Sequence, residues 1–115
     1  MKDSIAMTLL YDHYGDLLTR KQQTCFDLHY NQDYSLSEIA EEVGISRQGV
    51  HDSIARAEAM LLHLEQTLGC VARDARVQQA LAVISAAAHT LEESGDGRVR
   101  ALAGDILRAA DSVKE

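Results

Sequence analysis

Residues that interrupt or disfavour helices are scarce in this sequence. Its 115 residues include no proline and no tryptophan, and only four tyrosines and one phenylalanine. β-Branched residues are few, whereas Ala, Leu, Glu and Gln recur. Proline breaks helices and the straight-chain residues favour them, so this composition predicts helices joined by short turns. We therefore expect an all-α fold.

Paired cysteines and long apolar runs are absent too. Cys25 and Cys70 lie far apart and form no C-x-x-C pair, which is typical of reduced thiols in a cytosolic protein. No run of about 18 apolar residues exists, so we expect no helix that crosses a membrane. The first residues place Asp3 beside Lys2 and are apolar on one face only, which is unlike a signal peptide. These features predict a cytoplasmic protein.

Patterns that mark catalysis or ligand chemistry are missing as well. The sequence has no Gly-rich phosphate loop, and no Ser, Cys or Thr stands in a recognisable nucleophile context. No two of its histidines pair at metal-ligand spacing; they are His13, His29, His51, His63 and His89. We therefore expect no enzymatic activity, no cofactor and no metal.

Basic residues are outnumbered by acidic ones. The chain carries 11 Lys and Arg against 18 Asp and Glu, a net charge of −7. Residues 35–68 are the most acidic third, with two basic and six acidic residues. Because phosphate neutralisation supplies most of the non-specific affinity for DNA, this balance argues against strong unaided DNA binding.

The N-terminal half contains helices with readable ends. A first helix should run from about Asp3 to Leu18, since apolar residues recur there at helical spacing. These are Ile5, Leu9 or Leu10, Tyr14 and Leu17. Thr19 and Gln22 then fit a capping box that starts a second helix, which "NQDY" ends. All five aromatic residues precede residue 35, so we expect them to form the core of this half.

Residues 35–54, "SLSEIAEEVGISRQGVHDSI", fit a helix–turn–helix. Ser35 and Glu38 form a second capping box, and Gly44 suits the left-handed position that ends the first helix of the motif. Ala40 is the small residue required where the two helices cross. Ser46 caps the second helix, and three apolar residues pin that helix to the core: Ile45, Val50 and Ile54.

Several residues of the second helix are candidates for contact with a nucleic acid. If this helix enters a major groove, its early outward residues face bases. They are Arg47, Gln48, His51 and Asp52. Ser46 leaves the following amides near a helix N-terminus, where they can meet a phosphate, and Arg56 could reach a backbone phosphate. Asp52 would repel phosphate and Gly49 offers no side chain, so base reading and reuse of the helical pair for protein contact both stay open.

The second helix of the motif continues far beyond it. Its apolar residues step by four and three, as in a coiled coil: Val50, Ile54, Ala57, Leu61, Leu64 and Leu68. Gly69 ends this helix, and two further helices repeat the pattern. Their residues are Val77, Leu81, Ile84, Ala88 and Leu91, then Val99, Leu102, Ile106, Ala109 and Val113. We expect antiparallel packing, within one chain or between two, and a homodimer that uses the long helix or the C-terminal helices.

These observations divide the chain into two parts. Residues 1–56 should form a helix–turn–helix domain of the winged-helix-like or sigma region-four-like type. Residues 57–115 should form a C-terminal helical extension that dimerises or braces the protein. The abundant alanines of this extension should let its helix axes approach closely.

The N-terminal half resembles the YlxM family of small bacterial proteins, whose motif region is similar to region four of sigma factors. The resemblance is carried by "LT-x-K-Q", "YSLSEIAEE-x-G-x-SRQ-x-V-x-D-x-I" and "R-x-E-x-ML", in that order. It implies an all-helical cytoplasmic protein without catalysis. Members are typically encoded beside the protein component of the signal recognition particle, which implies a role in that pathway. Where this chain has Gly49, members more often have Ala.

Three functional interpretations follow. The first is a non-enzymatic regulatory or adaptor protein of the signal recognition particle pathway, which binds the particle's protein or RNA through the helix–turn–helix. The acidic surface suits a basic ribonucleoprotein partner. The alternative is a DNA-binding transcription regulator that uses Arg47, Gln48 and His51. A structural interaction module without nucleic-acid contact remains a third interpretation.

Overall fold

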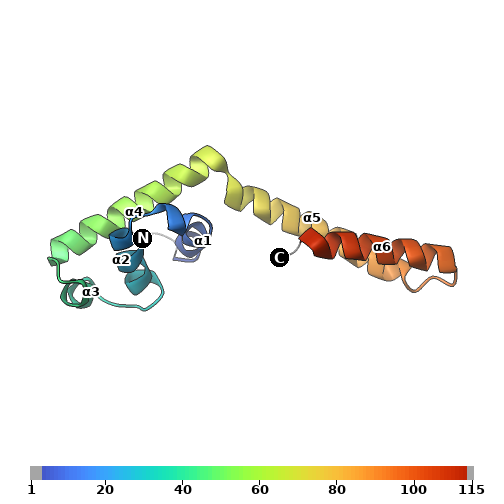
Figure 1. Ribbon diagram of the computed structural model, residues 1–115, viewed down its shortest axis with the longest axis horizontal. Helices are drawn as coiled ribbons and strands as arrows, with labels where there is room; N and C mark the ends of the chain where they lie inside the picture. Colours follow the sequence, from blue (N-terminus) through green and yellow to red (C-terminus); the bar gives the residue numbers. More distant parts are fainter. Residues whose placement is uncertain (1–3, 114–115) are drawn as a thin grey trace. The chain divides into compact units, whose positions relative to one another are not determined.

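The computed structural model describes residues 4–113, and these form helices and turns without any strand. The elements, shown in Figure 1, are α1 (Ser4–Tyr14), the 3-10 helix η1 (Gly15–Leu17), α2 (Arg20–Tyr30), α3 (Leu36–Val43), α4 (Arg47–Leu68), α5 (Cys70–Leu91) and α6 (Gly97–Val113). The all-α fold class is thus confirmed. The described residues also lack the β-hairpin that forms the wing of a winged helix. No helix among them is long and apolar enough to span a bilayer.

The chain divides into two compact units. Unit 1 comprises Met1–Val71 and unit 2 comprises Ala72–Glu115. All of α4 belongs to unit 1, so this division falls later along the chain than the boundary after residue 56 that the sequence suggested. The separate roles expected for residues 1–56 and 57–115 stay a prediction.

The ends of α2 lie where local signals place them. Thr19 Oγ1 accepts a hydrogen bond from the Gln22 amide at 3.2 Å, and Gln22 Oε1 accepts one from the Thr19 amide at 3.0 Å, which completes the capping box. The helix ends at Tyr30, and Asp33 follows in the left-handed region with a φ of 56°. The preceding helix, α1, ends at Tyr14 and not at Leu18 as expected, because the next three residues form the 3-10 helix η1. Its expected start at Asp3 lies outside the described residues.

The apolar face of the first helix also differs from the expected one. The side chains that it buries are Met7, Leu10 and Tyr14, and Leu18 is buried just after η1. Ile5 and Leu17, which the spacing predicted for the inner face, are 76% and 64% exposed. The switch to a 3-10 turn changes the angular step per residue, so a face extrapolated from α-helical spacing does not extend through residue 17.

The helix–turn–helix consists of α3, a tight turn and the first part of α4. Ser35 and Glu38 form the expected capping box, with hydrogen bonds of 3.0 and 3.1 Å. Gly44 has a φ of 80°, a left-handed conformation that a residue with a Cβ adopts only with strain. Ser46 then caps α4 by accepting a hydrogen bond from the Gly49 amide at 2.9 Å. These local interactions determine the residue at which α4 begins.

The apolar seam of α4 is covered by helices of its own unit. Val50 and Ile54 pack with Cys25 of α2 and Ile39 of α3. Further along, Ala57 and Leu61 pack among residues of α1 and α2, including Met7, Leu10, Tyr14 and Phe26. Only Leu68, at the end of the seam, is largely exposed, at 56%. The seam that suggested a partner helix is therefore the core of unit 1, and this stretch of α4 is not available as a dimer interface.

The aromatic residues help to hold this core, as the sequence predicted. The ring of Phe26 stacks between Tyr11 and Tyr30, with ring centroids 4.6 and 4.4 Å apart. The Tyr30 hydroxyl donates a hydrogen bond to Glu58, a buried carboxylate of α4. Burial, followed by this hydrogen bond, raises the pKa of Tyr30 above its ordinary value. The contact ties α2 to the middle of α4.

A second tyrosine joins α1 to the far end of α4. The Tyr14 hydroxyl donates to Glu65 Oε1 at 2.5 Å and accepts from the Cys70 amide at 3.0 Å. The same Glu65 oxygen accepts from the Val71 amide at 3.0 Å. Burial, followed by the bond to Glu65, raises the pKa of Tyr14 to about 12. The first two amides of α5 thereby find partners at a helix end, where intrahelical acceptors are missing.

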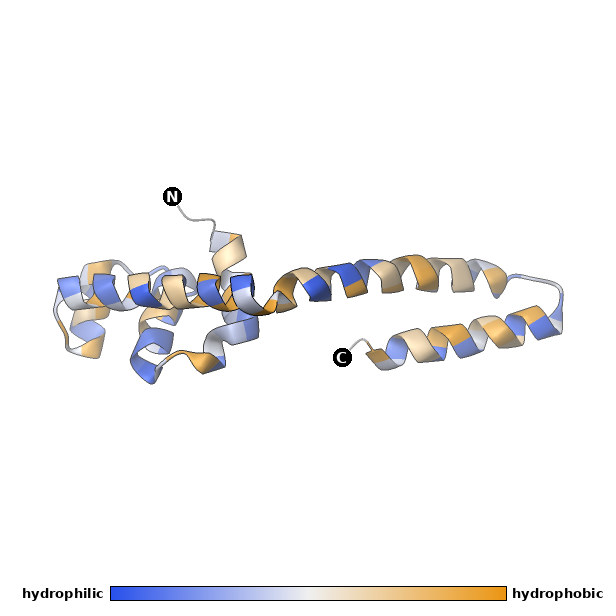
Figure 2. Cartoon of the chain, turned by 90° about the horizontal axis from the view of Figure 1, so that it is seen from above, coloured by the Kyte–Doolittle hydropathy of each residue, from blue (hydrophilic) through white to orange (hydrophobic). Residues whose placement is uncertain are grey.

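Unit 2 contains an antiparallel hairpin of α5 and α6, which overlap in Figure 1 and lie side by side in the turned view of Figure 2. Asp96 starts α6, since its Oδ1 accepts from the Arg98 amide at 2.9 Å. The buried residues are Ala88, Ala103 and Ala110, so the expected seam through Leu102, Ile106 and Val113 is wrong. These three are 38–55% exposed, whereas the residues that follow Leu102 and Ile106, Ala103 and Leu107, are buried and half-buried.

Candidate nucleic-acid interface

The residues of α4 that the sequence selected are all exposed, and the remaining one, Ser46, caps the start of the helix. Arg47 and His51 are four residues apart, and so are Gln48 and Asp52. The two members of each pair therefore lie about one turn apart on the same side of the helix. Arg47, Gln48 and Arg56 are exposed, and the side chains of His51 and Asp52 are 61% and 58% exposed. The opposite side, from Val50 to Leu61, is the buried seam. The helix thus presents a polar face whose position is fixed by the packing behind it.

Hydrogen bonds organise this face around Asp52. Gln48 Nε2 donates to Asp52 Oδ1 at 2.9 Å, and the same oxygen lies 3.5 Å from His51 Nδ1. The bond from Gln48, followed by the one from His51, lowers the pKa of Asp52 below its ordinary value. Asp52 is therefore ionised at neutral pH. The second N–H of Gln48 and its Oε1 have no bond to Asp52 and can still meet a base edge.

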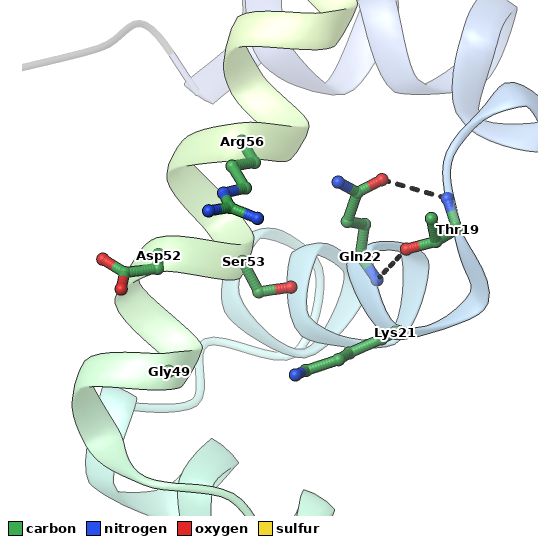
Figure 3. Close-up of a pocket in the computed structure, with 7 residues that line it drawn as sticks. All are labelled: Thr19, Lys21, Gln22, Gly49, Asp52, Ser53 and Arg56. Carbon is green, nitrogen blue, oxygen red and sulfur yellow. Dashed lines mark hydrogen bonds between the residues drawn. The ribbon is translucent and has the colours of Figure 1, made fainter.

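A pocket of about 360 Å³ lies between the first turn of α2 and the outward face of α4. Its lining residues are Thr19, Lys21, Gln22, Gly49, Asp52, Ser53 and Arg56. In Figure 3 the side chains of Lys21 and Gln22 point from α2 into the pocket, and those of Ser53 and Arg56 point into it from α4. The carboxylate of Asp52 points to the other side of α4.

The donors gathered in this pocket suit a phosphate. Arg56 brings a planar guanidinium and Lys21 an ammonium, the two cations that proteins use most for phosphate contacts. Ser53 adds a hydroxyl, and the side-chain amide of Gln22 adds a further donor. Because the cations come from two packed helices, their separation is set by the fold. The arrangement can hold an oxyanion such as a phosphate beside the exposed polar side of α4.

Sequence reasoning selected Arg56, and it allows Lys21 a phosphate contact only if Lys21 faces the same side as α4, which the structure shows that it does. The capping box at Thr19 and Gln22 places Lys21 in the first turn of α2, and the sequence predicted this capping box. The sequence did not predict that this turn lies close to α4, because that depends on how the two helices pack. Gln22 and Ser53 were missed for the same reason.

The acidic residues are distributed less evenly than the sequence suggested. Glu38, Glu41 and Glu42 are exposed on α3 and line a separate hollow of about 270 Å³ with Tyr34. The hydrogen bond from the Ser35 amide, followed by the one from its hydroxyl, lowers the pKa of Glu38. Glu58, another of the acidic residues within 35–68, is buried and accepts a hydrogen bond from Tyr30. The negative charge near the motif therefore gathers on α3.

The described residues offer no group for metal chemistry in this region. Among residues 4–113, no three His, Cys, Asp or Glu side chains gather closely enough to hold a metal ion. The chemistry that the pocket and the α4 face provide is hydrogen bonding and charge neutralisation.

A family model described as "UPF0122: Putative helix-turn-helix protein, YlxM / p13 like" matches residues 1–96. A UPF0122 protein of Thermoanaerobacter sp. strain X514 is 46% identical over 112 residues, which is 96% of each chain. A UPF0122 protein of Symbiobacterium thermophilum is 50% identical over 76 residues, 66% of this chain and 71% of its own. One of Acetivibrio thermocellus is 57% identical over 63 residues, 55% of this chain and 54% of its own.

Proposed function

This chain belongs to the UPF0122 family of YlxM/p13-like helix–turn–helix proteins, and from that premise we propose that it is a non-enzymatic, cytoplasmic regulatory or adaptor protein that binds nucleic acid. The observation that carries the proposal is the convergence of Lys21 and Arg56 on one pocket. The pocket borders the exposed polar face of a recognition helix that includes Arg47. In this arrangement the cations hold the backbone while the α4 face contacts bases or a partner protein.

The partner we propose is the signal recognition particle, through its RNA or its protein. The resemblance to the YlxM family supports this choice. Physical support comes from the charge balance, since unit 1 carries five basic and eleven acidic residues. A surface of this kind repels bulk duplex DNA except where its few cations meet phosphates, and it attracts a basic protein. A ribonucleoprotein offers both a basic protein and a phosphate backbone.

The second candidate function is transcription regulation by DNA binding. It is favoured by the exposure of Arg47, Gln48 and His51 on the first two turns of α4, the part of a recognition helix that meets base edges. The two functions differ in how strongly the chain should bind a random duplex.

Salt-dependent binding tests the proposal. With phosphate contacts from Lys21, Arg47 and Arg56, the logarithm of affinity for duplex DNA should fall against the logarithm of salt with a slope of about −2.7. Affinity for random duplex at physiological salt should be micromolar or weaker, and affinity for signal recognition particle RNA or protein should be tighter. Fluorescence anisotropy at several salt concentrations measures each of these.

Two substitutions assign the contact to the pocket. Lys21→Gln and Arg56→Gln should each weaken binding about three- to tenfold and reduce the salt slope by about one unit. The matched control is Arg76→Gln, which removes an exposed arginine of α5 and should leave both quantities unchanged. Equal losses in all three variants would contradict the pocket as the phosphate site. Submicromolar affinity for random duplex with a steep slope would instead favour the transcription regulator.

A pull-down of the tagged protein from its own cells, with the bound RNA and protein both identified, tests the partner separately. Recovery of signal recognition particle components, with loss of recovery for Lys21→Gln, is the expected result. Recovery of chromosomal DNA alone would contradict the adaptor role.

A further inference from the structure

Unit 2 buries its small apolar side chains and exposes its large ones. Along Ala72–Val113 the buried residues are all alanines: Ala88, Ala103 and Ala110. Larger apolar residues are exposed over 36–67% of their surface, and they are Val77, Val83, Ile84, Leu91, Leu102, Ile106 and Val113. Figure 2 shows hydrophobic colour recurring along both helices. Leu81, Val99 and Leu107 are half-buried, so the hairpin still leaves a large share of its apolar surface uncovered in a single chain.

Most of the outer apolar residues fall in two matching rows. The α5 row is Val77, Ile84 and Leu91, and the α6 row is Ile106 and Val113, continued toward the start of α6 by the half-buried Val99. Within each row the residues lie seven positions apart, so each row keeps to one side of its helix. Both rows span the same number of residues on antiparallel helices. A surface built this way is complementary to a rotated copy of itself, as a two-fold interface requires.

Charge also favours a second copy as the occupant of this surface. Unit 2 carries six basic and seven acidic residues, whereas unit 1 carries five basic and eleven acidic ones. Two copies of unit 2 therefore approach each other almost without net repulsion, and two copies of unit 1 repel. A membrane surface is disfavoured, because interfacial helices need an excess of Lys and Arg on their polar face.

We propose that the α5 and α6 rows form a homodimer interface, in which the hairpins of two chains pack into an antiparallel four-helix bundle. The rows supply the side chains that interdigitate between chains, while Ala88, Ala103 and Ala110 hold each hairpin together. The seam of α4 takes no part, because α1, α2 and α3 already cover it.

The state of association of the full chain tests this proposal. Light scattering coupled to gel filtration at micromolar concentration should give twice the monomer mass for the natural sequence. The double variant Ile84→Glu/Ile106→Glu should raise the dimer dissociation constant at least about 100-fold and give a monomer. The reason is that the interface would then bury carboxylates without partners. Both isoleucines are partly exposed in the single chain, at 45% and 38%, so circular dichroism should still report folded helices.

The matched control is Ile5→Glu, the same substitution at a 76% exposed isoleucine of unit 1, and it should leave the dimer intact. A natural chain that is monomeric at micromolar concentration overturns the proposal. So does a dimer that survives the double variant or is lost with Ile5→Glu. If the double variant loses its helices, the single variants Ile84→Glu and Ile106→Glu decide, since each should weaken the dimer by itself.

Discussion

Replacing Tyr30 by Phe isolates the hydrogen bond that ties α2 to the middle of α4. The substitution keeps the aromatic ring, which stacks on Phe26 at a centroid distance of 4.4 Å, and removes only the hydroxyl that donates to Glu58. A hydrogen bond to a charged group contributes about 1.5–3 kcal/mol to the free energy of unfolding. Because the Glu58 carboxylate is buried, we expect a loss of this size. For a domain of the length of unit 1, a loss of about 1.5–3 kcal/mol in the free energy of unfolding lowers Tm by roughly 6–24 °C.

Tyr11→Phe is the matched control on the other face of Phe26. Its ring also stacks on Phe26, but its hydroxyl meets only the Gln23 carbonyl at 3.5 Å, at the limit of a hydrogen bond. Its loss should cost less than about 1 kcal/mol. Urea unfolding followed by circular dichroism measures both variants. If Tyr30→Phe costs no more than Tyr11→Phe, the bond to Glu58 does not stabilise the fold and this reasoning is refuted.

The pH dependence of stability gives an independent measure of the same contact. The raised pKa of Tyr30 means that the folded chain holds the phenolic proton more tightly than the unfolded chain does. Its contribution is therefore complete below about pH 10, the ordinary tyrosine value, and is lost as the pH rises above it. Tyr30→Phe should flatten the alkaline decline in the free energy of unfolding. An unchanged decline would show that Tyr30 does not titrate with folding.

Two further substitutions examine the helix–turn–helix. Ala40→Leu should lower the free energy of unfolding by roughly 1–3 kcal/mol, because half-buried Ala40 packs against the cluster of Ile39, Val50 and Ile54 where α3 and α4 meet; unchanged thermal melting would mean that the contact tolerates a larger side chain. Asp52→Asn should raise affinity for nucleic acid about two- to fivefold in anisotropy titrations, since it removes a charge that repels phosphate and keeps an oxygen for the bond from Gln48. Equal affinity would place Asp52 away from the bound backbone.

Features set by neighbouring residues were predictable from the sequence. The capping boxes at Thr19 and Ser35 and the left-handed glycines Gly44 and Gly69 all lie where the sequence placed them. Each depends on interactions within one helical turn, so the residue types and their spacing contain the needed information. The all-α fold and the outward face of α4 followed from these ends and from the apolar spacing.

Features that depend on packing between helices were not predictable in the same way. The heptad pattern of α4 correctly predicted an apolar seam. It did not indicate which helices cover the seam, and in the structure these are α1, α2 and α3. In unit 2 the spacing allowed two adjacent seams, and the alanines Ala103 and Ala110, not Leu102 and Ile106, took the inner position. The pairing of Lys21 with Arg56 likewise needed the geometry of α2 against α4.

The confinement of every aromatic residue to the stretch from Tyr11 to Tyr34 has a spectroscopic consequence. Tyrosine fluorescence and near-ultraviolet circular dichroism report only on unit 1, whereas far-ultraviolet circular dichroism sums the helices of both units. The native chain therefore carries a probe that distinguishes its units without any label. Denaturation curves from the two signals coincide where the units unfold together and separate where one melts first. A tryptophan placed in α6 would make unit 2 visible in the same way.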